Sequence, residues 1–142
     1  MSDESEGCQI ILINDAGEVL LQLRDDKDWI PFPNMWAIPG GMLEAGESAA
    51  ECIRREVREE LGVTLAPEEI RLLEVRGRSY GIEHTFAARL DLPAEAITLT
   101  EGQRVAWFSQ AQITEMSLAY EDSTVLAEHL DRATLGAADS RE

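Results

Sequence analysis

The sequence predicts a mixed α/β fold (α+β), in which helices cover a mixed central sheet. Two apolar runs rich in β-branched residues, 8–13 and 19–23, are typical of strands, and a long helical pattern over 48–61 follows them. Further strand-like segments then precede a second helical pattern. Because helices and sheets bury their apolar faces against one another, the order strands, helix, strands, helix favours a layered domain.

The first half of the chain contains clear local signals. A polar turn ending in glycine joins the two strands at 8–13 and 19–23, as in a hairpin. Residues 25–35 hold two prolines and several charged side chains, so we expect a loop. The apolar segment that follows is stopped by Pro39, Gly40 and Gly41.

The strongest helix signal covers residues 48–61. Ser48 is a good N-cap, and Glu51 three residues later completes a capping box. Gly62 is a natural C-terminal stop, because glycine adopts the left-handed backbone conformation at little cost.

The second half predicts further elements of the same two kinds. Strands are expected at 70–77, 83–90 and 104–108. A final amphipathic helix is expected over 123–133, and its inward-facing residues are Val125, Leu126 and Leu130, with His129 as a further candidate.

Composition limits the classes of partner. With 142 residues the chain suits one domain, and 28 acidic residues against 12 basic ones make its formal net charge −16. Such a surface repels extended nucleic acid and anionic membranes. A small phosphorylated ligand is compatible with it if a cation or a local basic patch offsets the repulsion.

Other features indicate a cytoplasmic protein. Cys8 and Cys52 lack metal-type spacing and are expected to be free thiols in a reducing compartment. No stretch is apolar enough to span a membrane, and the acidic start is unlike a signal peptide. The polar ends predict an N-terminal tail over 1–7 and a flexible C-terminal tail over 133–142.

Three carboxylates gather on one side of the first helix. Placed on a helical wheel, Glu56, Glu59 and Glu60 lie beside the apolar stripe, and Arg54, Arg55 and Arg58 lie on the opposite side. Like charges at this spacing repel, and a hard divalent cation such as Mg²⁺ would remove the repulsion. The alternative is an ordinary solvated helix face.

The loop before this helix favours the first interpretation. Gly40 and Gly41 let the backbone turn tightly and approach a ligand closely. The helix N-terminus that follows offers free N–H groups to an anion. The order loop, helix and carboxylates would let a metal and a phosphate meet.

Nine residues over positions 41–63 resemble the signature of the Nudix (MutT-like) hydrolases. They are Gly41, Glu47, Arg55, Glu56, Val57, Glu59, Glu60, Gly62 and Val63. The resemblance implies a Nudix-type α/β/α sandwich over residues 8–132. It also implies a small-molecule nucleotide substrate, no nucleic-acid or membrane partner, and a family in which homodimers are common.

The resemblance assigns roles residue by residue. It implies that Glu56, Glu59, Glu60 and the Gly40 carbonyl bind Mg²⁺, or Mn²⁺ in its place. Arg55 would orient a ligand carboxylate, and Glu47 would brace the loop against the helix. Among the carboxylates we favour Glu56 as the general base.

Two assignments outside the signature are less specific. Glu101, six residues before Trp107, is a candidate additional metal ligand or water activator, and the alternative is an exposed turn residue. As contacts for a substrate phosphate we expect Arg24 first, with Arg76 and Arg78 as weaker candidates. We also expect the Gly41 backbone to contact the substrate.

The implied reaction is Mg²⁺-dependent cleavage of a diphosphate linkage. We expect a nucleoside triphosphate or a related nucleoside diphosphate derivative as substrate. The alternative substrates are a dinucleoside polyphosphate or a nucleotide sugar, and the alternative class is a non-catalytic nucleotide-sensing domain.

Overall fold

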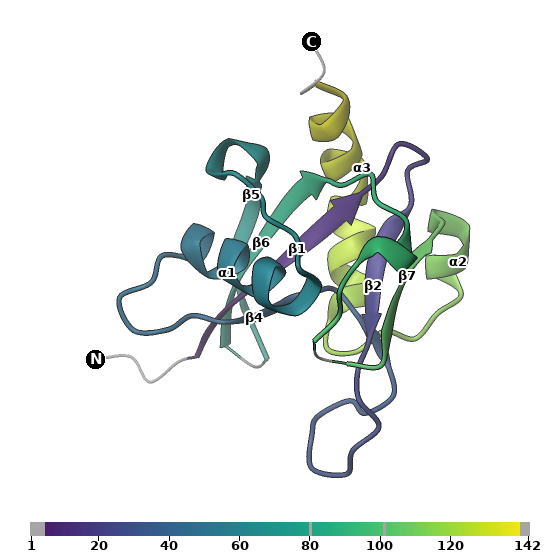
Figure 1. The fold of residues 1–142 in the computed structure, drawn as a ribbon. Coiled ribbons are helices and arrows are strands. Elements are labelled where there is room, and N and C mark those ends of the chain that lie inside the picture. Colours follow the sequence, from purple (N-terminus) through teal and green to yellow (C-terminus); the bar gives the residue numbers. More distant parts are fainter. Residues whose placement is uncertain (1–4, 80, 101, 140–142) are drawn as a thin grey trace.

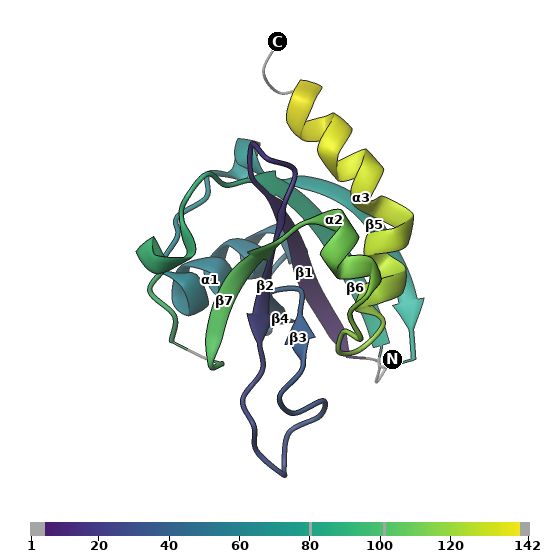
Figure 2. The same ribbon diagram turned by 90° about the vertical axis from the view of Figure 1, so that its right-hand side faces the viewer.

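A seven-stranded mixed sheet forms the middle layer of the part of the chain that the structure describes. The computed structural model describes residues 5–79, 81–100 and 102–139. The strands are β1 (Glu6–Ile13), β2 (Val19–Leu23), β3 (Trp36–Ala37), β4 (Gly40–Met42), β5 (Arg71–Arg78), β6 (Gly81–Arg89) and β7 (Arg104–Phe108). The helices are α1 (Ala49–Leu61), α2 (Gln110–Thr114) and α3 (Asp122–Asp139), with 3₁₀ turns η1 (Pro67–Glu69) and η2 (Ala94–Ala96). Helix α1 covers one face, and α2 and α3 cover the other (Figures 1 and 2).

The sheet divides between its two central strands. The strand order is β3-β2-β1-β6-β5, with β1 and β6 parallel and the other pairs antiparallel. Strands β1 and β2 pair at Ile13 and Val19 and then diverge (Figure 1). Beyond that point β1 pairs with β4, while β2 lies between β3 and β7. A gap therefore opens in the middle of the sheet.

Two apolar cores lie on the two faces, because successive side chains of a strand point to opposite sides. From β1, Ile10 and Leu12 pack toward α1, whereas Ile11 and Ile13 pack toward α3. All four are nearly inaccessible to solvent. The continuous apolar run at 8–13 is thus explained by burial on both faces, and the predicted layered α/β fold is confirmed.

Helix α1 begins and ends where the sequence predicts. The Ser48 side chain accepts a hydrogen bond from the Glu51 N–H at 3.1 Å, and the Glu51 carboxylate accepts one from the Ser48 N–H at 2.9 Å. Gly62 ends the helix with φ 68° and donates its N–H to Arg58 O. Local capping interactions therefore determine where the acidic helix begins and ends.

Secondary structure extends into the segments predicted as tails. Strand β1 includes residues 6–7 of the segment 1–7, and α3 includes residues 133–139 of the segment 133–142. Strand pairing with β6 and cooperative propagation of the helix account for the difference. The short α2, capped by Ser109, was not expected. Within the described ranges, no helix combines the length and apolar character needed to cross a bilayer.

We expect Ser48→Ala to lower the free energy of unfolding by about 1 kcal/mol, because the Glu51 N–H loses its acceptor. Urea denaturation of wild type and variant measures the change. Ser48→Thr keeps the acceptor and is the matched control. Equal stability of the alanine variant and wild type would contradict the role of this cap.

Candidate active site

A cavity of about 570 Å³ opens where β1 and β2 diverge. Its volume lies in the range of small-molecule sites. Glu60 of α1 and Asp122 of α3 both line it, although these helices cover opposite faces of the sheet. The cavity therefore reaches through the gap between the strands, with Gly40 and Gly41 on its wall.

The guanidinium of Arg55 is the centre of the carboxylate cluster beside this cavity. Its Nη1 donates to Glu56 Oε1 at 2.6 Å and to Glu59 Oε2 at 3.2 Å. Its Nε and Nη2 donate to the Glu47 carboxylate at 2.6 and 2.9 Å. Nη2 also donates to the Met42 carbonyl at 3.1 Å. One side chain thus joins the loop before α1 to two carboxylates of the helix.

The expectation that Arg55 faces away from the glutamates was wrong. Arg55 and Glu59 are four residues apart and share a helix face, and the long arginine side chain also reaches Glu56. Repulsion among the carboxylates is therefore partly offset within the protein. Crowding of these side chains does not by itself require a cation.

Electrostatics make this network strong. The hydrogen bond from Arg55, with a second from the Glu44 N–H, lowers the pKa of Glu47 to about 2. The same bond to Glu47 raises the pKa of Arg55 further above its usual value. Both partners therefore stay charged at every physiological pH, and the loop remains tied to the helix.

The glycines at the cavity wall make room for other parts of the protein. A Cβ at position 40 would lie 2.1 Å from the Cys8 carbonyl oxygen on the paired strand. A Cβ at position 41 would lie 2.3 Å from the carboxylate carbon of Glu56. Gly40 is thus required by the β1–β4 pairing. The absence of a side chain at Gly41 leaves room for the Glu56 carboxylate.

The carboxylates of Glu56, Glu59 and Glu60 are chemically suited to bind a hard divalent cation. Glu60 is only 6% exposed, yet it lines the cavity. Glu56 is mostly buried and lies against Gly41, while the side chain of Glu59 is 56% exposed. Carboxylate oxygens and a neighbouring backbone carbonyl are the ligand types that Mg²⁺ takes.

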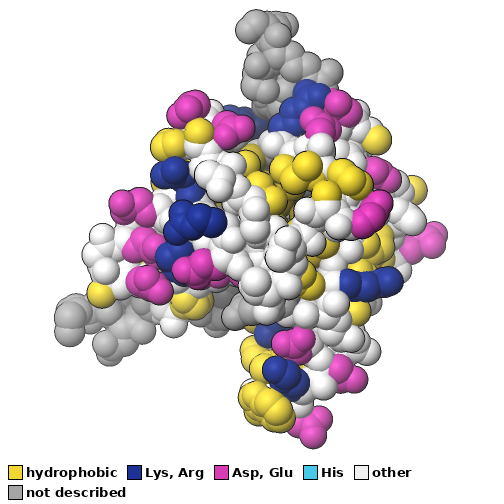
Figure 3. Space-filling model, viewed as in Figure 1, with side chains coloured by type: hydrophobic (Ala, Val, Ile, Leu, Met, Phe, Trp, Pro, Cys, Tyr) yellow, Lys and Arg dark blue, Asp and Glu magenta, His cyan; other side chains and the backbone are white. Residues whose placement is uncertain are grey.

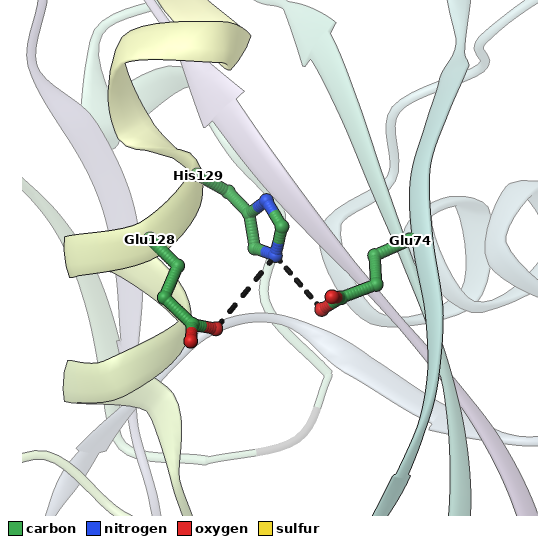
Figure 4. Close-up of side chains that lie close together, drawn as sticks. All are labelled: Glu74, Glu128 and His129. Carbon is green, nitrogen blue, oxygen red and sulfur yellow. Dashed lines mark hydrogen bonds and ion pairs between the residues drawn. The ribbon is translucent and has the colours of Figure 1, made fainter.

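A second cluster of metal-ligand types lies elsewhere in the described chain. Ligand atoms of Glu74, Glu128 and His129 fall within 4.8 Å of one another, and the histidine Nε2 lies 2.8 Å from Glu74 Oε1 (Figure 4). Arg76 forms ion pairs with both of these carboxylates. None of these residues lines the cavity. We interpret the cluster as an ion-pair network that ties α3 to β5.

The predicted phosphate-binding arginines have different surroundings. Arg24 lines the cavity, its Nε donates to Pro31 O, and its guanidinium lies 5.2 Å from the centre of the Tyr120 ring. Arg78 does not line the cavity. Its side chain is only 2% exposed and forms ion pairs with Glu74, Glu83 and Glu121. The structure therefore does not support Arg78 as a substrate contact.

Two further sequence predictions concern Glu101 and the loop at 25–35. Glu101 lies outside the described residues, so its proposed role stays a prediction. The loop at 25–35 contributes Lys27 and Ile30 to the cavity and projects from the sheet as a lobe (Figures 1 and 3). Trp29 in this lobe is 79% exposed.

Several polar residues that line the cavity were not predicted from the sequence. Gln9, Gln22 and Glu83 come from strands and are buried, and Asp122 begins α3. The sequence could have indicated Gln9 and Gln22, because each is a polar residue within an otherwise apolar strand. Asp122 carried no such signal, because an aspartate at a helix start is a common capping residue.

Asp122 has an unusual environment. Its Oδ2 accepts a hydrogen bond from the Ile38 N–H at 2.9 Å, and its Oδ1 is buried without a hydrogen-bond partner. Burial raises the pKa of this carboxyl group to about 7, despite the Ile38 hydrogen bond. The nearby Glu83 raises the pKa as well, whereas Arg78 and Arg24 lower it.

The fold and site define an α/β/α domain with a carboxylate-bearing helix beside a small-molecule cavity. The family model for the NUDIX domain matches residues 6–129. The chain therefore belongs to the Nudix family, as the signature over 41–63 predicted.

Known proteins share part of this sequence or its fold. The nucleoside triphosphatase NudI of Escherichia coli K12 is 45% identical over 60 residues, 42% of this chain and 41% of that protein. The match thus spans about two fifths of the length of the curated relative. A MutT structure from a study of Aliivibrio salmonicida and Vibrio cholerae has a TM-score of 0.74 and 22% identity, and covers 90% of this chain and 98% of that one. The NUDIX domain of Shewanella oneidensis NrtR, complexed with ADP ribose, has a TM-score of 0.76 and 21% identity, over 93% and 90% of the two chains. These two structures support the fold.

Alanine at the two wall glycines should destabilise the protein to different extents. Gly40→Ala forces backbone atoms apart, so we expect a loss of about 3 kcal/mol in the free energy of unfolding. Gly41→Ala meets the end of a flexible side chain, and we expect about 1 kcal/mol. Gly77→Ala is the control, because open space surrounds that position, and should change stability by no more than about 1 kcal/mol. Urea titrations test this order, and equal losses at positions 40 and 77 would refute it.

The raised pKa of Asp122 predicts a pH dependence of stability. The folded protein binds this proton more tightly than the unfolded chain, so the stabilisation is complete below about pH 4 and is lost as pH rises to about 7. The loss amounts to about 4 kcal/mol at most. Urea denaturation of wild type and Asp122→Asn between pH 4.5 and 8 measures this loss, as the difference between their free energies of unfolding. Wild type should lose stability relative to the variant, and parallel curves would contradict the assignment.

Proposed function

We propose that this protein is a magnesium-dependent nucleotide pyrophosphatase. Its substrate would be a nucleoside triphosphate or a related nucleoside diphosphate derivative. The observation that carries the proposal is the cluster in which Arg55 holds Glu56 and Glu59 beside a cavity lined by Glu60. Membership of the Nudix family and the similarity to a nucleoside triphosphatase support it.

Four groups would hold the metal ion. They are the carboxylates of Glu56, Glu59 and Glu60 and the backbone carbonyl of Gly40, all oxygen donors suited to Mg²⁺ or Mn²⁺. When bound, the ion would neutralise phosphate charge and lower the pKa of a bound water. It would also offset the repulsion between a polyphosphate and a chain of net charge −16.

The remaining chemistry falls to residues of the chain. Arg55 would position the Glu56 carboxylate through the 2.6 Å hydrogen bond, without itself contacting the reacting atoms. Glu56 would accept the proton of the attacking water. The water oxygen would bond to one phosphorus while the bridging phosphorus–oxygen bond breaks, and two phosphorylated products would leave. Arg24 on the cavity wall would contact a substrate phosphate.

Substrate choice is testable with a panel of nucleoside triphosphates, dinucleoside polyphosphates, nucleotide sugars and ADP-ribose. We expect Mg²⁺-dependent hydrolysis of at least one class, with products resolved by chromatography. Glu59→Gln and Glu60→Gln should each lower kcat/KM by about 10²-fold or more, because each removes a charged oxygen ligand. Unfolding curves confirm that the variants remain folded.

Glu51→Gln is a matched control on the same helix. Glu51 only caps α1, and glutamine preserves an acceptor for the Ser48 N–H, so activity should be unchanged. If no member of the panel is cleaved with Mg²⁺ or Mn²⁺, the proposal fails and a nucleotide-sensing domain becomes the better interpretation. Full activity of Glu60→Gln would exclude the proposed metal site.

A further inference from the structure

Two carbonyl oxygens near the end of α1 accept hydrogen bonds from a residue far away in the sequence. The Thr100 hydroxyl donates to Glu59 O at 2.6 Å, and the Thr100 N–H donates to Glu60 O at 3.0 Å. Both acceptors belong to residues whose carboxylates would bind the metal ion. Thr100 lines the cavity, as Glu60 does. One residue of the loop before β7 thus binds the backbone of two proposed metal ligands.

The last turn of α1 needs donors from outside the helix, because the final carbonyls of an α-helix have no partner within it. The Gly62 N–H donates to Arg58 O, which closes the last turn. The carbonyls of Glu59 and Glu60 follow that position, and Thr100 donates to both. The helix dipole also places partial negative charge at this end, where it disfavours nearby carboxylates. The two Thr100 donors offset part of that charge.

The loop that carries Thr100 is anchored on both sides of that residue. Before it, Ile97 and Leu99 pack against the apolar core on the α1 face of the sheet. After it, the Gln103 N–H donates to the carbonyl of Leu23, the last residue of β2, at 2.8 Å. These anchors hold the Thr100 donors in place, so little entropy is lost when they bind the helix carbonyls.

We propose that Thr100 is a positioning residue of the metal site, because its hydrogen bonds hold the last turn of α1 and thereby the carboxylates of Glu59 and Glu60. Arg55 holds the Glu56 carboxylate one turn earlier. A metal ion binds more tightly when its ligands are already in place, since ordering them costs free energy. The inference rests on the proposed metal site, and direct metal binding tests it separately from hydrolysis.

Thr100→Val tests the hydroxyl, because valine keeps the shape of the side chain and the backbone N–H. The full-length protein is titrated with Mn²⁺ alone, and electron paramagnetic resonance of the free ion yields the dissociation constant. We expect this constant to rise about tenfold, as when a group that holds a metal ligand is removed. The free energy of unfolding should change little, because Thr100 is exposed and water can bind the Glu59 carbonyl instead.

Three further variants separate the hydroxyl from other effects. Thr100→Ser keeps the donor and should bind Mn²⁺ like wild type, whereas Thr100→Ala lacks it and should show the same loss as valine. Thr114→Val is the matched control at another exposed threonine. The Thr114 hydroxyl also donates to helix carbonyls, those of Gln110 and Ala111 at 3.0 and 2.8 Å, but α2 covers the face opposite α1 (Figure 2). This control should leave Mn²⁺ affinity unchanged.

The Mg²⁺ dependence of hydrolysis gives a second measurement. Thr100→Val should need about tenfold more Mg²⁺ for half-maximal activity, while kcat at saturating Mg²⁺ stays near the wild-type value. A purely structural role would instead lower the fraction of folded protein, and with it the apparent kcat, at an unchanged Mg²⁺ requirement.

The outcomes distinguish this inference from the proposed activity. Weaker Mn²⁺ binding in Thr100→Val and Thr100→Ala, in a protein that hydrolyses no nucleotide, would support the positioning role and refute the pyrophosphatase. Hydrolysis by wild type, with equal Mn²⁺ affinity in wild type and both variants, would refute the positioning role alone. Failure of wild type to bind Mn²⁺ would overturn the positioning role together with the proposed metal site.

Discussion

The site depends on one guanidinium group that binds carboxylates from two segments. Arg55 holds Glu47 of the loop together with Glu56 and Glu59 of α1. Because arginine remains charged and forms several directed hydrogen bonds, it fixes the carboxylates in orientation as well as in position. It thereby links the loop before α1 to the acidic side of that helix. The shape of the cavity wall at Gly41 depends on the same contact, since the Glu56 carboxylate lies against that glycine.

The divided sheet supplies the space in which this cluster can act. Strands β1 and β2 separate after a single paired position, and the segment containing β3 and β4 bridges them. The resulting cavity brings α1 on one face and α3 on the other to the same small volume. Residues of both helices, Glu60 and Asp122 among them, therefore line a single cavity.

Two acidic clusters in this molecule illustrate why carboxylates alone do not define a site. Glu74 and Glu128 lie close to His129, but Arg76 pairs with both of them and no part of the cluster lines the cavity. Arg55 likewise pairs with Glu56 and Glu59, yet Glu60 on the same helix lines the cavity. The two clusters thus differ in access to a cavity of ligand size.

The sequence by itself determined the features that depend on neighbours along the chain. Capping residues and helical spacing set the limits of α1, and the nine signature residues predicted the family and the carboxylate cluster. Contacts between distant segments were decided by the tertiary structure. Arg78 is locked among three glutamates, and Asp122 is buried beside Ile38, 84 positions away in the chain. Burial and pairing are properties of the packed molecule, because they depend on which surfaces meet, and residue type and spacing do not encode them locally.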